Sequence, residues 1–184
     1  MSSEFQALSD PDILRLAAYV LQDRCTENRH LEHAHQSRFH SSRIPQISMW
    51  DYLHRIARYS HCSPECILIT IIYLDRYVER TRIPLTFRNI HRLTITAVTV
   101  AAKLRDDVYY ANSYYASIGG VTVQEMNILE LELLTNIDWV TWVEPSEYNL
   151  YVAQLVRRFS NDATQTGTLQ CTEEATATPV APVQ

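Results

Sequence analysis

The sequence of 184 residues predicts an all-α fold. Between residues 45 and 160, apolar residues recur every three to four positions, which is the spacing of one helix face. The whole chain holds only three glycines, so few positions interrupt a helix. Helix-start signals punctuate the pattern, such as Ser63-Pro64-Glu65, where a cap is followed by a first-turn proline and an acid.

The first two helices are expected over residues 11–21 and 48–59. Pro11 suits the first position of a helix, and Ser9 or Asp10 can cap it. Each segment has one apolar stripe, formed in the first by Ile13, Leu16, Ala17, Val20 and Leu21 and in the second by Met49, Tyr52, Leu53 and Ile56. These stripes predict amphipathic helices that pack on a core.

The third and fourth helices are expected over residues 63–80 and 86–104. Residues 93–100 read Leu-Thr-Ile-Thr-Ala-Val-Thr-Val, a β-branched run that local propensity would assign to a strand. The length of the run and the alanines at 97, 101 and 102 favour a helix instead. A helix that is apolar on all sides is a fully buried, central one.

Three further helices are expected after residue 111. A short one spans residues 112–118 and stops at Gly119-Gly120. The next starts at Thr122, with Glu125 three residues on as a capping box, and its apolar stripe runs to Ile137. The last covers residues 145–159 and is strongly amphipathic.

The segments that flank this helical region are polar. Residues 24–45 are rich in histidine and are expected to form a loop or extension, and residues 161–184 are rich in Thr, Ala and Pro and predict a disordered tail. The first ten residues lack the pattern of a signal peptide, and the most apolar stretch, 66–74, is too short to span a bilayer. We therefore expect an intracellular protein of the nucleus or cytoplasm, with reduced cysteines and no membrane partner.

Composition argues against several functions. Glycines at 119, 120 and 167 cannot form a nucleotide-binding fingerprint, and no Gly-x-Ser-x-Gly elbow occurs, so we expect no enzyme, no cofactor and no small-molecule substrate. The net charge of −5 argues against nucleic acid as a partner. Four histidines, at 30, 33, 35 and 40, are expected to lie in a solvated loop, and no metal site is predicted.

Two charged residues occupy unusual positions. Glu130 lies within an apolar stripe of its helix, where a lone carboxylate would be costly to bury. Lys103 ends the wholly apolar helix and is the only lysine in the chain. Each residue also has a simpler explanation. Glu130 could be a carboxylate at the rim that bends out to water, and Lys103 a C-terminal lysine favoured by the helix dipole. The alternative hypothesis pairs the two across adjacent helices and offers them jointly to a partner.

The core resembles a cyclin box, in particular that of the single-box P-type, PHO-like cyclins. The matching elements, in order, are Pro45-Gln-Ile-Ser48, Tyr52-Leu-His-Arg-Ile56, Tyr73-Leu-Asp-Arg-Tyr77, residues 94–107 ending in Lys-Leu-Arg-Asp-Asp, Tyr109-Tyr-Ala-Asn-Ser-Tyr-Tyr-Ala116, Gly119-Gly120, Glu125-Met-Asn-Ile-Leu-Glu130 and Asp138-Trp139. The resemblance covers about residues 45–143, and the order of these elements is more specific than any one of them.

The resemblance implies a single five-helix cyclin box over residues 45–143. An N-terminal helix and polar extension would precede it over 1–44, and a flanking helix over 144–160 would follow. The protein would be a regulatory subunit of a cyclin-dependent kinase, and Lys103 and Glu130 match the positions that grip the PSTAIRE-type helix of the kinase. A further hypothesis lets Asp106 and Asp107 meet an arginine of the kinase activation loop.

The sequence departs from the mitotic cyclins at one motif. Gln46 stands where their Met-Arg-Ala-Ile-Leu motif has an arginine. In those cyclins the arginine pairs with the aspartate that corresponds to Asp75, and part of the motif docks Arg-x-Leu substrates. Here Asp75 therefore needs another partner, and docking of Arg-x-Leu substrates is not expected. Two alternatives remain open. One is a cyclin-fold scaffold that presents its last helix to a partner other than a kinase, and the other is a DNA-binding cyclin fold, which the acidic balance disfavours.

Overall fold

The computed structural model describes residues 9–165, with side chains to residue 158. This part of the chain is all-helical, as the sequence predicts, with no strand. The helices are α1 (Asp10–Glu27), the short 3-10 helix η2 (Arg29–Leu31), α2 (Met49–Ser60), α3 (Pro64–Thr81), α4 (Ile90–Arg105), α5 (Asn112–Gly119), α6 (Val123–Asn136) and α7 (Pro145–Gln165). All seven expected α-helices occur, with ends shifted by a few residues in most cases.

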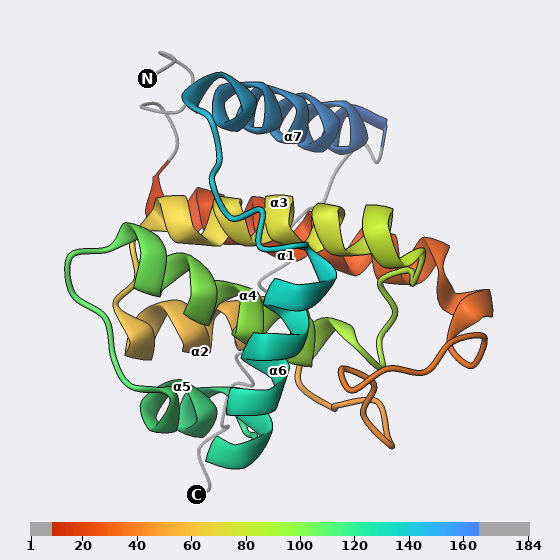
Figure 1. Cartoon of the computed structure of the whole chain (residues 1–184). Helices are drawn as coiled ribbons and strands as arrows, with labels where there is room; N and C mark the ends of the chain where they lie inside the picture. Colours follow the sequence, from red (N-terminus) through yellow and green to blue (C-terminus); the bar gives the residue numbers. More distant parts are fainter. Residues whose placement is uncertain (1–8, 166–184) are drawn as a thin grey trace, which may run out of the picture.

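Helix α4 lies at the centre of the molecule, in contact with α2, α3, α5 and α6 (Figure 1). Twelve of its sixteen residues are buried. This is the β-branched segment whose local propensity favours a strand, so burial on all sides overrides propensity here. The hydroxyls of Thr96 and Thr99 donate to the carbonyls of Arg92 and Ile95 at 2.7 and 2.8 Å, which lets them lie in the core.

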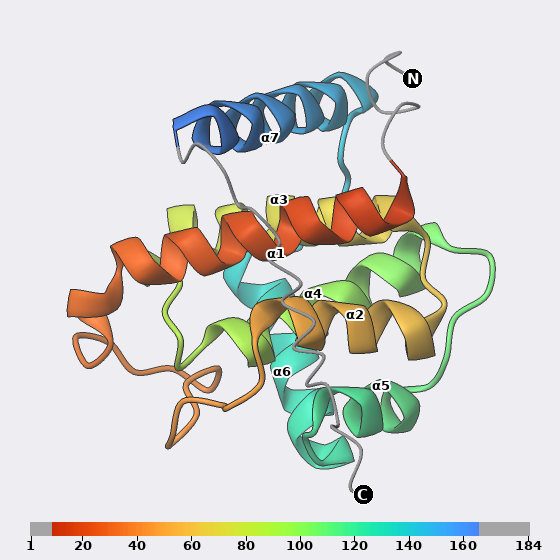
Figure 2. The same cartoon turned by 180° about the vertical axis from the view of Figure 1, so that it is seen from behind.

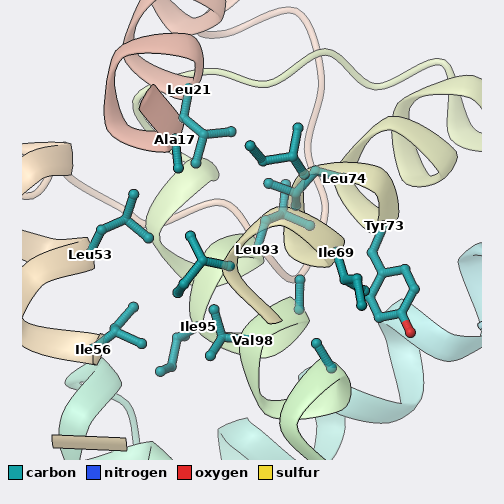
Figure 3. Packing of buried hydrophobic residues seen from close by; sticks show 14 of the residues in the cluster. Ala17, Leu21, Leu53, Ile56, Ile69, Tyr73, Leu74, Leu93, Ile95 and Val98 are labelled. Atoms are coloured by element: carbon teal, nitrogen blue, oxygen red, sulfur yellow. The ribbon is translucent and has the colours of Figure 1, made fainter. Parts of the chain in front are cut away.

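The core is formed by apolar side chains that converge on α4 from its neighbours. Figure 3 shows Ala17 and Leu21 of α1, Leu53 and Ile56 of α2, and Ile69, Tyr73 and Leu74 of α3 around Leu93, Ile95 and Val98. Each of these is fully buried. Burial of a Leu or Ile side chain contributes roughly 1.5–3 kcal/mol, so this cluster fixes how the helices pack.

The first helix is longer than expected. It was predicted to end at Leu21, but α1 continues to Glu27. The apolar stripe continues through the fully buried Cys25, while Asp23, Arg24 and Glu27 around it make ion pairs that periodicity alone does not show.

The segment between α1 and α2 is a largely exposed loop that two buried side chains anchor to the fold. Phe39 is fully buried, and the centre of its ring lies 5.4 Å from that of Tyr77 in an edge-to-face arrangement. The buried Glu32 accepts hydrogen bonds from the backbone N–H groups of Phe87 and Arg88 at 2.8 and 3.2 Å, in the turn before α4. The expectation of a polar loop is confirmed for most of this segment, whereas residues 24–27 belong to α1 and residues 29–31 to η2. Glu32 and Phe39 anchor the loop to the start of α4 and to α3.

Asp75 on α3 finds its partner in Arg24 of α1. The guanidinium makes two parallel hydrogen bonds to the carboxylate, of which Nη2 to Oδ2 measures 3.2 Å. Both side chains are about three-quarters buried, at 22% and 27% exposed. Arg24 thus supplies the arginine partner of Asp75 that Gln46 cannot supply. The sequence did not predict this pair, because Arg24 was assigned to a loop.

Helix α7 packs across α1 and α3 on the outside of the bundle (Figure 2). Val152 and Leu155 are its buried contacts. Both carboxylate oxygens of Glu147 accept from Arg76 at 2.9 Å, and Arg158 donates to Asp23 at 2.5 Å. The helix continues to Gln165, beyond its expected end, and the rest of the predicted disordered tail, 166–184, lies outside the described residues.

Replacing Arg24 by alanine should lower the free energy of unfolding by about 1–3 kcal/mol, because the carboxylate of Asp75 then remains largely buried without its cation. Urea denaturation followed by circular dichroism measures this. Arg15→Ala is the control on the same helix, since the ion pair of Arg15 with Asp12 is exposed and should change stability much less. An equal effect of both variants would contradict the assigned role.

Stability should fall as the pH drops below about 6.5, in part through His91. This residue is buried on α4, its Nε2–H donates to the carbonyl of Ile47 at 3.1 Å, and Nδ1 has no partner. Burial lowers the pKa of His91, so the unfolded chain takes up a proton at higher pH than the folded chain. Denaturation at pH 7.5 and 5.5 should show a smaller loss for His91→Gln than for the wild type. The exposed His30→Gln serves as the control, and an unchanged pH dependence in His91→Gln would refute the assignment.

Candidate functional site

The structure brings Lys103 and Glu130 together. Lys103 lies in the last turn of α4 and Glu130 in the middle of α6, and Nζ is 2.7 Å from Oε1. The two side chains are 26% and 19% exposed, so the pair is largely desolvated while one edge still faces solvent. The structure confirms that Lys103 and Glu130 pair across adjacent helices. The role of this pair in binding a partner stays a prediction.

Asn112 completes the cluster. Its side-chain amide donates to Oε2 of Glu130 at 2.7 Å and to Oδ1 of Asn127 at 2.8 Å. Both carboxylate oxygens of Glu130 are therefore hydrogen-bonded, and α4, α5 and α6 meet at one carboxylate. No local pattern singles out Asn112 as a site residue, because only the packing of α5 on α6 brings it to Glu130.

Exposed apolar side chains also occur on α4, on α6 and in the segment after α6. Leu104 follows Lys103 and Leu131 follows Glu130, and both are more than half exposed. Trp142 is 62% exposed, and the guanidinium carbon of Arg105 lies 5.3 Å from the centre of its ring. A largely desolvated charge pair and large apolar side chains open to solvent are both features of protein–protein interfaces. Sequence reasoning missed Trp142, whose place beside the end of α4 depends on the fold.

Asp106 and Asp107 differ in their surroundings. Oδ2 of Asp106 accepts from the backbone N–H of Ser63 at 3.1 Å, so this carboxylate ties the end of α4 to the start of α3. Asp107 is exposed, and no hydrogen bond or ion pair joins it to another described residue. Burial raises the pKa of the neighbouring Cys66 thiol to about 12, and Asp106 adds to the shift, which keeps the thiol protonated and unreactive.

The histidines of the 30–40 segment make separate hydrogen bonds. Nδ1 of His33 lies 3.0 Å from Nη1 of Arg88, and Nδ1 of His40 accepts from the backbone N–H of Ser37 at 2.9 Å. Within residues 9–165, no group of three His, Cys, Asp or Glu side chains is close enough to hold a metal ion.

Comparison with known proteins assigns the chain to a family. The sequence profile of the cyclin domain matches residues 14–141. The chain is a cyclin. It is 39% identical over 163 residues to Cyclin-U4-1 of Arabidopsis thaliana, covering 83% of this chain and 81% of that protein. It is 38% identical to Cyclin-P3-1 of Oryza sativa subsp. japonica, covering 79% and 64% of the two chains.

These relatives confirm the resemblance to P-type cyclins. Cyclin-P4-1 of rice is also similar, at 41% identity over 67% of this cyclin and 59% of the relative. The matched segment begins inside α1, well before the box start predicted at residue 45, and the predicted domain limits themselves stay predictions. None of the described helices combines the length and the apolar character needed to cross a membrane.

Asp106→Ala should destabilise the cyclin by about 1 kcal/mol, because the N–H of Ser63 loses its acceptor. Asp107→Ala should leave the urea midpoint unchanged, since its side chain is exposed. Comparison of the two variants by denaturation tests this difference. Equal midpoints for both would show that the Asp106 hydrogen bond does not stabilise the fold.

Proposed function

We propose that this cyclin is the regulatory subunit of a cyclin-dependent protein kinase, which it binds and activates. Membership of the cyclin family supports a regulatory role. A further relative carries such a role in its name: the chain is 44% identical over 126 residues to the Nuc-1 negative regulatory protein preg of Neurospora crassa, of which it covers 26%. The observation that carries the proposal is the largely desolvated Lys103–Glu130 pair, on two helices that also carry the exposed Leu104 and Leu131.

The pair has hydrogen-bonding capacity left for a partner. The ammonium of Lys103 has three donors, and Glu130 accounts for one of them. Its remaining donors suit the carbonyl groups at the end of a kinase helix, and the remaining lone pairs of Glu130 suit backbone N–H groups. We therefore assign to this pair the grip on the PSTAIRE-type helix, with Leu104, Leu131 and Trp142 as the apolar contacts.

Activation then follows from a shift of populations. A kinase is inactive when the helix that carries the glutamate partner of its ATP-binding lysine is misplaced. A rigid cyclin surface that binds only the active placement favours that state. A shift from 1:99 to 99:1 needs about 5.5 kcal/mol of differential binding, which an interface of roughly 2,000 Å² can supply.

Of the two aspartates expected to meet the kinase activation loop, one is the better candidate. Asp107 has an exposed carboxylate without a partner among the described residues, so it is the better candidate to meet an arginine of the kinase. Asp106 already accepts from Ser63 and holds the loop in place. We propose that Asp107 makes the contact and that Asp106 positions it.

Lys103→Ala and Glu130→Ala should each abolish kinase activation while the fold remains intact. Loss of one partner of a desolvated charge pair costs about 2–5 kcal/mol, or roughly 30-fold to several thousand-fold in affinity. Copurified kinase activity and circular dichroism are measured together. The matched control is Arg92→Ala, which breaks an ion pair between the same two helices, Arg92 to Glu125 at 2.7 Å, at their other end. Loss of helical signal in the site variants would make both residues structural.

Selective amine labelling provides a second test, because Lys103 is the only lysine. If the cyclin is purified with its kinase, Lys103 should be protected until the kinase is removed. Free labelling of Lys103 in a preparation without any kinase would favour the scaffold alternative. In that case, a peptide of residues 145–159 should compete for the partner, since this alternative gives α7 the binding role.

A further inference from the structure

A second surface lies between α2 and α5, two helices that pack side by side (Figure 2). A cleft of about 320 Å³ opens there, lined by Arg55, Tyr59, Tyr114, Ser117 and Ile118. It lies on the α2 side of α5, whereas Asn112 of the same helix binds Glu130 on the α6 side. The proposed kinase contact makes no use of this cleft.

The aromatic walls of the cleft are held in place by the fold. The hydroxyl of Tyr114 donates to the backbone carbonyl of Tyr59 at 2.9 Å, which joins α5 to the end of α2. The ring of Tyr114 also lies 4.4 Å from that of Tyr110. Tyr59 and Tyr114 nevertheless remain 48% and 37% exposed. Fixed aromatic rings that stay open to solvent suit an apolar side chain of a partner.

The charge of the cleft is positive and uncompensated. No described carboxylate lies within ion-pair distance of Arg55 or Arg58. Arg55 donates to the carbonyl of Ile118, but its Nε has no hydrogen-bond partner. The guanidinium carbon of Arg58 lies 5.6 Å from the centre of the Tyr59 ring. The only acid of α2, Asp51, is bonded to Ser48 at the opposite end of that helix, and α5 carries no acid.

We propose that this cleft docks an acidic peptide segment of a partner protein. An aspartate or glutamate of the peptide meets Arg55 and Arg58, and a neighbouring aromatic or aliphatic side chain enters between Tyr59 and Tyr114. A peptide that presents arginine is disfavoured by like charge. Nucleic acid also offers negative charge, but the net charge of −5 of the chain repels a polyphosphate backbone.

Selection of random peptides displayed on phage against the purified full chain tests this proposal. The enriched peptides should carry Asp or Glu beside an apolar residue, and they should bind less tightly as salt is added. Labelled copies are then measured by fluorescence polarisation. Arg58→Glu, at an exposed position, should weaken binding by about tenfold or more, and Ser117→Trp should weaken it by filling the cleft.

Two controls keep the outcome specific. Arg29→Glu reverses a charge on η2, away from the cleft, and should bind the peptides like the wild type. Lys103→Ala should also bind normally, which separates this proposal from the proposed kinase contact. Enrichment of arginine-rich peptides, no enrichment at all, binding unaffected by both cleft variants, or tighter binding of a single-stranded oligonucleotide than of any peptide would each overturn the proposal.

Discussion

Burial of α4 on nearly every side is the constraint on which the rest of the structure depends. Over residues 93–102 the helix has no solvent face and cannot carry charge, so its sequence there is restricted to small, β-branched and aliphatic residues. Thr96 and Thr99 fit because their hydroxyls bond their own backbone. It leaves the core at Arg92, which pairs with Glu125, and at its C-terminal end. That end is where Lys103, Leu104 and Arg105 reach the surface, and α5 and α6 are arranged around it.

Much of this fold could be predicted from local sequence. Caps and periodicity predict the seven α-helices, and the proline of Ser63-Pro64 and the box of Thr122 and Glu125 mark their starts. A charged residue inside an apolar stripe was enough to single out Glu130 and to suggest its pairing with Lys103. These signals work because each depends only on residues within one or two helical turns.

What the sequence could not predict depends on contacts between distant segments. Arg24 is separated from Asp75 by about fifty residues, and nothing near Arg24 distinguishes it from the other polar residues around it. Glu32 has the same difficulty, since its partners are backbone N–H groups in the turn before α4. Asn112 and Trp142 belong to the candidate site only because α5 and the segment after α6 return to the end of α4.

The candidate site is also formed before any partner arrives. Glu130 is held by Lys103 from α4 and by Asn112 from α5, so its rotamer is already fixed in the free chain. Immobilising a long, flexible side chain at an interface usually costs about 0.5–1.5 kcal/mol. Here part of that cost is met during folding, which leaves more of the contact energy for binding.

The ion pairs of α7 have a consequence for how the molecule opens. The inner helices are joined mainly by apolar burial. Among its described residues, α7 has two fully buried side chains, Val152 and Leu155, some partly buried ones, and the ion pairs of Glu147 with Arg76 and of Arg158 with Asp23 and Glu27. Salt screens the attraction within such partly exposed ion pairs. At moderate concentration it changes the stability that comes from apolar burial only a little. Backbone amides of α7 should therefore exchange with deuterium before those of α4, so that the cyclin has a salt-labile outer layer over a salt-resistant core.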